Sequence, residues 1–312
     1  MKKQRRKFWT PLRGTVIALL IIAAVAAAIA WYLQGKNVAV FNPQGTIASD
    51  EFNLIKFTLM LSAMVVIPVY IMLFAIAFRY RESNHEKKKV KYTPDAPDMR
   101  WLEVIWWAIP IMIIGLLAVV TWVSTHQLDP YRAIDSNVKP LRVQVVVLQW
   151  KWLFIYPDYH VASVNQLKLP AETPVNFAIT ADGPMSTFWI PNLGSQIYAM
   201  PGMTSQLSLM ADHAGSYPGY NTNINGTGYS DMYFKAEALP TQQDFDQWAQ
   251  SVTAKPDHKV LDWASYTELA RPSRTRDVTY YGLKDDNLYT EVVNKFMEAK
   301  TPAVSTNEEG NK

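Results

Sequence analysis

Two long apolar segments constrain this chain more than any other feature of its sequence. The first is FTLMLSAMVVIPVYIMLFAIAF at residues 57–78, and the second is WLEVIWWAIPIMIIGLLAVVTWV at residues 101–123. A helix of 22 residues is about 33 Å long, enough to cross the hydrocarbon core of a bilayer. Tryptophans stand toward both ends of the second segment, as in an interfacial aromatic belt. We therefore expect a transmembrane hairpin within residues 34–126, with helices at about 54–79 and 101–124.

The loop between these segments predicts the orientation of the hairpin. Residues 79–100 are rich in Lys and Arg, including the run from Lys87 to Lys91. Short loops with this composition stay in the cytoplasm. Everything after Ser124 is then expected outside the cytoplasm. In a bacterium with two membranes, this predicts a multi-pass protein of the inner membrane, in contact with lipid, with a globular domain in the periplasm.

The N-terminal residues 1–33 have two interpretations. A basic segment (1–13) precedes an apolar one (15–30) that ends in Ala28-Ile29-Ala30, as in a secretory signal peptide. The alternative is an uncleaved anchor helix, because residues 15–33 are nearly long enough to span. The cleavage point stays open. The chain contains no cysteine, which excludes disulfides, thiolate ligands and lipidation of an N-terminal cysteine.

The second half of the chain predicts a β-sandwich. The segment 141–156 places Val143, Val145 and Val147 on one face and gathers aromatic residues in its second half. Segments 173–180, 204–211 and 232–239 also alternate between apolar and polar residues, with turn residues between them. Short strands at such spacing indicate an antiparallel sandwich or barrel. We expect this domain to span residues 127–239.

The C-terminal part predicts helices again. Apolar residues recur at three- and four-residue spacing in 241–254, and the segments 265–273 and 286–299 follow similar patterns. These segments predict a helical arm over residues 240–299. The polar end, residues 300–312, is predicted to be disordered. The fold class is thus an α+β membrane protein: a two-helix transmembrane hairpin, an antiparallel β-sandwich and a short helical arm.

Composition and motifs argue against three functions: nucleic-acid binding, hydrolysis and copper binding. A net charge of +3 gives no indication of nucleic-acid binding. No G-x-S-x-G or H-E-x-x-H motif occurs, so the sequence does not indicate a hydrolase. The stretch GYNTNINGTGYSDMYF (219–234) has the outline of a metal-binding loop, but Met232 is its one soft ligand. Copper electron-transfer sites need thiolate and imidazole. We therefore expect no metal in this chain, and we expect His160 and His213 to be surface residues.

Glu103 is an ionisable residue in the first turn of the second apolar helix. One interpretation places it at the membrane interface, solvated or paired with Arg100. The other interpretation is a proton-uptake group, because carboxylates in membrane helices often mark ion paths.

Several motifs together resemble a known family. They are EVIWWAIPI (103–111), QWKW (149–152), FWIPNLGSQIYAMPGM (188–203) and the loop at 219–234, combined with two transmembrane helices and an outer sandwich. This set resembles subunit II of the haem–copper respiratory oxidases, from about residue 42 to 297. The resemblance implies a cupredoxin-like sandwich. In the cytochrome c oxidases of that family, the loop reads Cys-x3-Cys-x3-His-x2-Met and, with an upstream His, holds a dinuclear copper centre.

The resemblance assigns degenerate copper-ligand positions in this chain. Counting back from Met232 places Tyr229 at the loop histidine, and Asn225 and Asn221 at the two cysteines. The upstream histidine corresponds to about Ser186. With these replacements, the chain resembles the cytochrome bo-type ubiquinol oxidases, whose subunit II lacks the copper centre.

The resemblance also implies a function and partners. It predicts a non-catalytic subunit of a proton-pumping ubiquinol oxidase that reduces oxygen to water. Haems and copper are expected in subunit I, ubiquinol as the substrate of the complex, and no contact with cytochrome c. Glu103 matches a Glu at the mouth of a proton channel into subunit I. One alternative is a membrane-anchored binding module or an assembly factor. A cytochrome c oxidase subunit II is a weaker alternative, because the chain has no cysteine.

Overall fold

The computed structural model describes residues 38–79, 100–254 and 258–297, and scattered helical positions between 20 and 32. The chain divides into two compact units, Met1–Asn42 and Pro43–Lys312. In the first unit the described positions between 20 and 32 are helical, and a 3-10 helix, η1, spans Ala39–Phe41. The basic N-terminal segment, most of the charged loop and the tail lie outside the described residues. The signal peptide, the side of the membrane on which the loop lies and the disordered tail therefore stay predictions.

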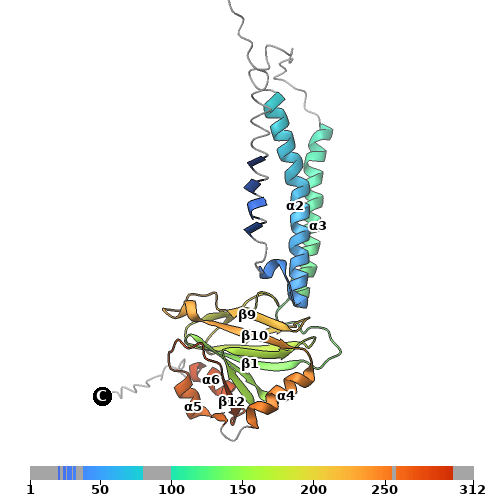
Figure 1. Ribbon diagram of the computed structural model, residues 1–312. Helices are drawn as coiled ribbons and strands as arrows, with labels where there is room; N and C mark the ends of the chain where they lie inside the picture. Colours follow the sequence, from blue (N-terminus) through green and yellow to red (C-terminus); the bar gives the residue numbers. More distant parts are fainter. Residues whose placement is uncertain are drawn as a thin grey trace, which may run out of the picture. The chain divides into compact units, whose positions relative to one another are not determined.

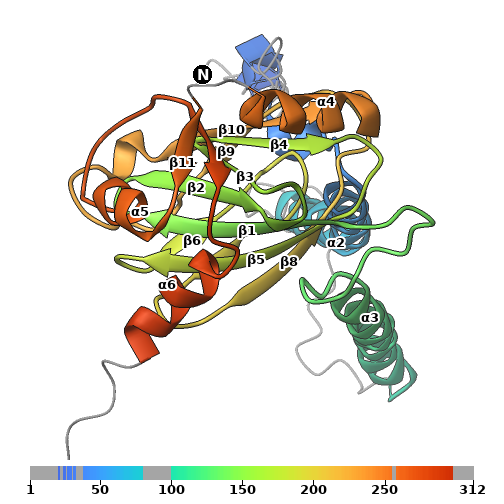
Figure 2. The same cartoon turned by 90° about the horizontal axis from the view of Figure 1, so that it is seen from below.

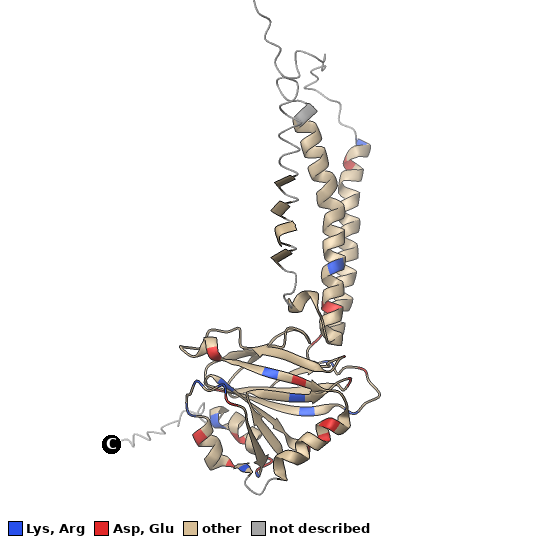
Figure 3. Cartoon of the chain, in the orientation of Figure 1, with Lys and Arg blue, Asp and Glu red and all other residues tan. Residues whose placement is uncertain are grey.

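Two helices of the second unit correspond to the predicted transmembrane segments. Helix α2 spans Thr46–Arg79 and helix α3 spans Arg100–Gln127 (Figure 1). Both are apolar and long enough to cross a membrane, and no residue in the most apolar stretch of either is buried inside the described chain. Charged residues are rare along both helices (Figure 3). A core helix of a soluble protein would be mostly buried, so these exposed apolar surfaces require lipid or neighbouring subunits.

Helix α2 begins earlier than the sequence predicts, at Thr46 rather than at about residue 54. Its first turn is attached to the sandwich. The hydroxyl of Thr46 donates to Asp212 Oδ1 at 2.7 Å, and the Ala48 N–H donates to Leu193 O at 3.1 Å. Gly45 lies so close to the sandwich backbone that a Cβ there would stand 2.5 Å from a carbonyl oxygen. Tertiary contacts, rather than hydropathy, thus determine where this helix starts.

Most of the strands belong to one large sheet. Among the described residues, seven strands pair in the order β11-β12-β3-β2-β1-β5-β8, three in the order β4-β10-β9, and β6 pairs with β7. The strands are β1 Leu141–Leu148, β2 Lys151–Tyr156, β3 Val161–Val164, β4 Gln166–Pro170, β5 Val175–Asp182, β6 Ser186–Phe188, β7 Ile197–Ala199, β8 Ser205–Leu209, β9 Gly215–Tyr220, β10 Tyr233–Leu239, β11 Lys259–Leu261 and β12 Thr279–Leu283.

The sandwich is confirmed, but its pairing is mixed rather than purely antiparallel. Strands β1 and β5 pair in parallel along their full length, and β4 pairs in parallel with the last five residues of β10. A parallel pair needs a crossover connection, because a tight hairpin can join only antiparallel neighbours. Here β1 and β5 are separated in the chain by β2, β3 and β4. Alternation of side chains predicts a strand but not the direction of its neighbour, which explains the difference.

The segment 141–156 is a hairpin rather than one continuous strand. Strand β1 ends at Leu148, β2 begins at Lys151, and the two pair antiparallel. Trp150 makes the turn with φ of 70°, a left-handed conformation that is unusual for a bulky residue. No Gly or Asn-Gly marks this turn, and the sequence pattern therefore missed it.

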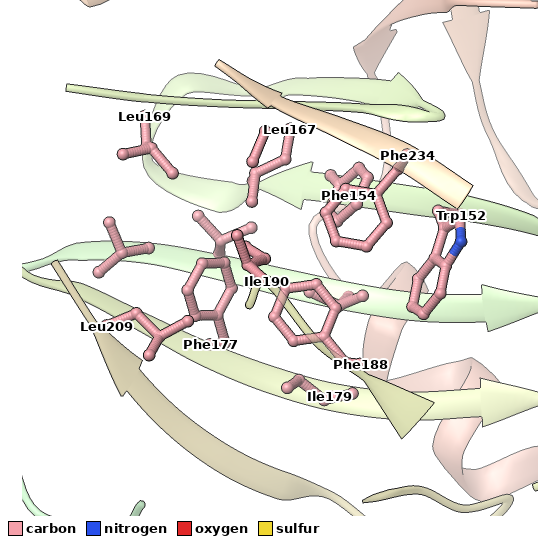
Figure 4. Packing of buried hydrophobic residues seen from close by; sticks show 14 of the residues in the cluster. Trp152, Phe154, Leu167, Leu169, Phe177, Ile179, Phe188, Ile190, Leu209 and Phe234 are labelled. Atoms are coloured by element: carbon pink, nitrogen blue, oxygen red, sulfur yellow. The ribbon is translucent and has the colours of Figure 1, made fainter. Parts of the chain in front are cut away.

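The main core lies between the large sheet and the three-stranded sheet (Figure 4). Val143, Val145 and Val147 all point into it, as their spacing predicts. Aromatic rings fill its centre: the rings of Phe188 and Phe234 stack at 5.3 Å, and the ring of Trp152 lies 4.8 Å from that of Phe234. Aromatic pairs at such distances stabilise beyond their buried area. This core supports the end of the sandwich at which β9 and β10 are joined.

The segment after residue 240 contains helices α4 Gln242–Thr253, α5 Trp263–Leu269 and α6 Leu288–Met297. The expected helical arm is present, but it also contributes strands β11 and β12, and β12 pairs with β3. Figure 2 shows α5 and α6 beside the large sheet. There they cover a second core, which includes Val146, Leu153 and, from the helices, Tyr266 and Val292. Both faces of this sheet are therefore buried, which is why β2 is buried along its whole length.

Candidate functional site

The loop that resembles a copper site joins β9 to β10. These strands form an antiparallel hairpin whose last pair is Tyr220 with Tyr233, so the whole loop from 221 to 232 projects from one end of the sandwich. The Asn221 N–H donates to Met232 O at 3.3 Å and closes its base. A 3-10 turn, η4, spans Tyr229–Asp231 immediately before Met232. The loop is thus held at both ends by the sheet.

Four of the five predicted positions share one buried cluster. Asn221 and Asn225 donate through their Nδ2 atoms to the sulfur of Met232, at 3.4 and 3.3 Å. Asn225 Nδ2 also donates to Ser186 Oγ at 2.8 Å, which brings in the start of β6. The side chains are almost inaccessible, with exposed fractions of 1% for Ser186, 5% for Asn221, 7% for Asn225 and 2% for Met232. We call these four residues the amide–thioether cluster.

The fifth predicted position does not join this cluster. Tyr229 begins η4, is partly exposed, and its side chain makes no hydrogen bond to the described part of the chain. It contributes through its backbone, because the Met232 N–H donates to Tyr229 O at 3.1 Å.

Asn221 also organises the backbone around the cluster. Its Oδ1 accepts from the Thr187 N–H at 2.9 Å, from the Thr187 hydroxyl at 3.1 Å and from the Asn223 N–H at 3.0 Å. Its Nδ2 donates to Asn223 O at 2.9 Å. The carboxamide thus connects β6 to the loop across 34 positions of sequence. Sequence reasoning missed the role of Thr187, which carries no ligand chemistry and no local signal.

Trp150 covers the outside of the loop. A Cβ at Gly228 would stand 2.3 Å from the indole ring, and one at Gly226 would stand 3.2 Å from it. These glycines therefore allow the ring to lie against the loop backbone. Within the described residues, Trp150 Nε1 and Asn225 Oδ1 are buried without a hydrogen-bond partner. The QWKW motif contributes two tryptophans with different surroundings. Trp152 is buried in the main core, whereas Trp150 lies against Gly226 and Gly228 of the loop.

The side chains of the cluster do not fit a copper centre. They offer a hydroxyl, two carboxamides and a thioether, whereas copper electron-transfer sites use thiolate and imidazole to bind the metal and tune its potential. Within the ranges that the structure describes, no three His, Cys, Asp or Glu residues gather in a way that could hold a metal ion. His160 is an exposed residue that pairs with Asp286 at 2.9 Å. The cluster is suited to hydrogen bonding within the protein.

The C-terminal segment lies against the same end of the domain. Arg276 forms an ion pair with Asp231 of η4 at 2.5 Å, and its guanidinium lies 4.5 Å from the ring centre of Tyr233. The guanidinium of Arg274 lies 5.6 Å from the ring of Trp150. These contacts place the connection between α5 and β12 over the loop and its covering tryptophan.

A buried carboxylate attaches the C-terminal helices to the sheet. Asp182, at the end of β5, accepts from Tyr266 Oη at 2.6 Å and from Lys295 Nζ at 2.8 Å. Burial, reinforced by the neighbouring Asp182, raises the pKa of Tyr266 far above its usual range. The phenol therefore remains a neutral donor. Helices α5 and α6 are in this way an integral part of the domain.

Glu103 lies in the first turn of α3, on an exposed part of the helix. In the described part of the chain it forms no ion pair, with Arg100 or with any other residue. The carboxylate is therefore accessible from outside this chain.

Comparison with known proteins identifies both halves of the outer domain. Residues 161–239 match the family described as cytochrome c oxidase subunit II, periplasmic domain, and residues 255–300 match the COX aromatic rich motif. The periplasmic domain of subunit II of cytochrome oxidase from Bradyrhizobium japonicum covers 39% of this chain and 98% of its own, at 19% identity and a TM-score of 0.36. The family match to a subunit II periplasmic domain agrees with the expected sandwich.

Relatives that match over most of the chain are quinol oxidase subunits. The cytochrome bo(3) ubiquinol oxidase subunit 2 of Pseudomonas putida is 44% identical over 280 residues, which are 90% of this chain and 87% of that protein. The ubiquinol oxidase subunit 2 of Acetobacter aceti is 38% identical, over 88% of each chain. At this identity and coverage, the chain belongs to the family of cytochrome bo(3) ubiquinol oxidase subunit 2.

Proposed function

We propose that this chain is the copper-free subunit II of a proton-pumping ubiquinol oxidase that reduces oxygen to water, and that it carries no redox centre of its own. Its role is to bind and position the other oxidase subunits. Haems and copper belong to subunit I, which receives electrons directly from ubiquinol. Cytochrome c has no part in the reaction.

One observation carries this proposal: the side chains at four of the loop-site positions form hydrogen bonds with one another. In a copper-binding subunit, these positions would present lone pairs to the metal. Here Asn225 and Asn221 direct N–H donors at the sulfur of Met232, the one soft ligand of the loop, and Ser186 accepts a hydrogen bond from Asn225. A buried polar group without a partner costs roughly 1–3 kcal/mol, so such replacements keep the loop closed without a metal.

The proposed place of the chain is the bacterial inner membrane. Helices α2 and α3 span the bilayer, and the sandwich lies on the periplasmic side. The basic loop between the helices then lies in the cytoplasm, in agreement with the usual excess of Lys and Arg there. The exposed apolar surfaces of both helices are available to lipid and to subunit I.

Glu103 is the proposed contribution of this chain to proton movement. In the proposed topology it lies at the cytoplasmic end of α3, where a carboxylate can exchange protons with water and still face a neighbouring subunit. Its carboxylate forms no ion pair within the described chain, and carboxylates in membrane helices often mark ion paths.

Affinity purification of the tagged chain from native membranes tests the proposal. The expected result is a complex that contains a haem-bearing membrane subunit and consumes oxygen when supplied with ubiquinol. Recovery of the chain with no haem protein would contradict it and would favour the free-standing binding module.

A further inference from the structure

The loop between β9 and β10 contains the one Asn-Gly pair of the sequence, Asn225–Gly226. Asparagine is chemically labile, because the next backbone nitrogen can attack its side-chain carboxamide. Glycine in the next position leaves that nitrogen unhindered, since it has no Cβ. The other asparagines of the loop, Asn221 and Asn223, precede β-branched residues, which crowd the nitrogen. In this loop, position 225 is therefore where the chain most easily modifies itself.

The fold requires both members of this pair. Gly226 has φ of 118°, which L side chains rarely adopt, and a Cβ there would stand 3.2 Å from the ring of Trp150. The carboxamide at 225 is needed because its Nδ2 donates to Ser186 Oγ at 2.8 Å and to Met232 Sδ at 3.3 Å. A carboxylate has no such donors. The closed loop thus depends on a labile pair.

The closed loop leaves the nucleophile free but holds the group that it must attack. The Gly226 N–H donates no hydrogen bond within the described chain. The Asn225 Oδ1 is buried without a partner among the described residues, so no donor polarises the carbonyl. The Nδ2 atom, which must leave as ammonia, is bound to Ser186 and Met232. Asn225 is also only 7% exposed, which limits the access of water. The reaction therefore requires the loop to open.

We propose that Asn225–Gly226 is a self-modification site whose reaction is controlled by the amide–thioether cluster. When the loop opens, the Gly226 nitrogen forms a bond to Asn225 Cγ and gives up its proton. The bond from Cγ to Nδ2 breaks, and the side-chain nitrogen leaves as ammonia with that proton. One water molecule then opens the resulting cyclic imide, leaving aspartate or isoaspartate at position 225. The reaction consumes only water and needs no oxidant, metal or enzyme.

The product cannot rebuild the cluster. The carboxylate formed at position 225 accepts hydrogen bonds but donates none, so the sulfur of Met232 loses one of its two donors. A negative charge would also stand in a nearly inaccessible site beside a thioether and a carboxamide, which is unfavourable. The change is irreversible. The chain thus keeps a covalent record that its loop has opened, a property that goes beyond the proposed function.

Peptide mapping by mass spectrometry measures this reaction in the full chain, within the purified complex. Incubation in heavy-oxygen water at mildly alkaline pH labels the product, because the water supplies one of its oxygen atoms. A synthetic peptide of residues 219–234 gives the rate without the sandwich. We expect conversion at Asn225 to be at least about tenfold slower in the full chain, because two buried hydrogen bonds must break first. Equal rates, or no conversion in the peptide, would overturn the proposal.

Removal of one hydrogen-bond acceptor tests the control by the cluster. Ser186→Ala deprives the Asn225 Nδ2 atom of its oxygen partner and should raise the rate in the full chain about fivefold. Ser230→Ala is the matched control, since Ser230 is exposed in the same loop and its side chain makes no hydrogen bond within the described chain. Amide hydrogen exchange along β9 and β10 verifies that both variants are folded. Equal rates in the two variants would show that the cluster does not control the reaction.

A variant that carries the product tests its effect on the loop without waiting for the reaction. In the full chain, Asn225→Asp should make amide hydrogen exchange of the loop at least about fivefold faster, because the cluster is incomplete. The Asn221 N–H, which donates to Met232 O at 3.3 Å, reports on the base of the loop. Thr227→Asp adds the same charge at an exposed position and should leave the exchange unchanged. Equal exchange in the two variants would overturn the claim that the product keeps the loop open.

Discussion

Replacing Asn221 with alanine should destabilise the outer domain more than its single side chain suggests. The Oδ1 atom of Asn221 accepts from the buried Thr187 N–H and from Asn223, and its Nδ2 donates to Asn223 O and Met232 Sδ. The alanine variant removes all of these interactions at once. Thr187 is only 2% exposed, so no water can easily take the place of the lost acceptor.

The expected magnitude follows from these contacts. A buried N–H donor that loses its partner costs about 1–3 kcal/mol. The space left by the carboxamide adds about 0.5–1 kcal/mol in a site that is already closed. The free energy of unfolding should therefore fall by about 1.5–4 kcal/mol. Asn223→Ala is the matched control: its side chain makes one described hydrogen bond, to Met185 O, and is partly exposed, so its loss should cost about 1 kcal/mol or less.

Urea denaturation of a soluble fragment, residues 128–297, measures both variants through tryptophan fluorescence. The fragment includes both hydrophobic cores and the C-terminal helices that cover the second one. With a slope of about 2 kcal/mol per molar urea, the midpoint of the Asn221 variant should move by about 0.8–2 M. Equal midpoints for the two variants would refute the claim that the amide–thioether cluster holds the loop closed.

Three further outcomes are expected. Glu103→Gln should lower the rate of ubiquinol oxidation while haem content and assembly are retained. An unchanged rate would assign Glu103 to the membrane interface, where exposed ion pairs contribute only about 0–1 kcal/mol. Protease added to intact spheroplasts should cleave after Ser124 and spare residues 79–100; the reverse pattern would invert the topology. Burial raises the pKa of Tyr289 to about 12, so its contribution to stability is complete below about pH 10 and is lost as pH rises toward 12. In urea titrations of the fragment, the free energy of unfolding should fall with rising pH less steeply in Tyr289→Phe than in the unchanged fragment, by about 1.4 kcal/mol per pH unit. The same steepness in both would count against the burial of the Tyr289 hydroxyl.

The sequence predicted the parts of the fold that depend on local pattern. Apolar length alone identifies α2 and α3, and alternation identifies β5, β8 and β10 within about two residues of their bounds. Helix α4 starts at Gln242, next to the predicted start, because Thr241 and Asp244 form a capping box that is visible in the sequence.

The features that were missed depend on distant contacts. Strand β11 has three residues, too few for a periodic pattern, and β12 is recognisable only once it pairs with β3. Trp150 has a positive φ in the turn, and its ring lies against Gly228 of a loop far along the chain. Tertiary packing of this kind overrides local propensity.

The candidate site was predicted in outline through its resemblance to a copper loop. Its positions could be aligned by counting from Met232, and four of them do meet in the structure. Their mutual hydrogen bonds could not be predicted, because amide orientation depends on Ser186 and Thr187, which are more than 30 positions away. Tyr229 shows the limit of such counting, since it aligns with a ligand position but its side chain does not join the cluster.

The electron donor of the purified native complex tests the central claim most directly. Oxygen consumption is measured with ubiquinol and with reduced cytochrome c, and copper is measured in this chain after it has been separated from the other subunits. The account predicts rapid oxidation of ubiquinol, none of cytochrome c, and no stoichiometric copper in the separated chain. Turnover with cytochrome c, together with tightly bound copper in this chain, would contradict it.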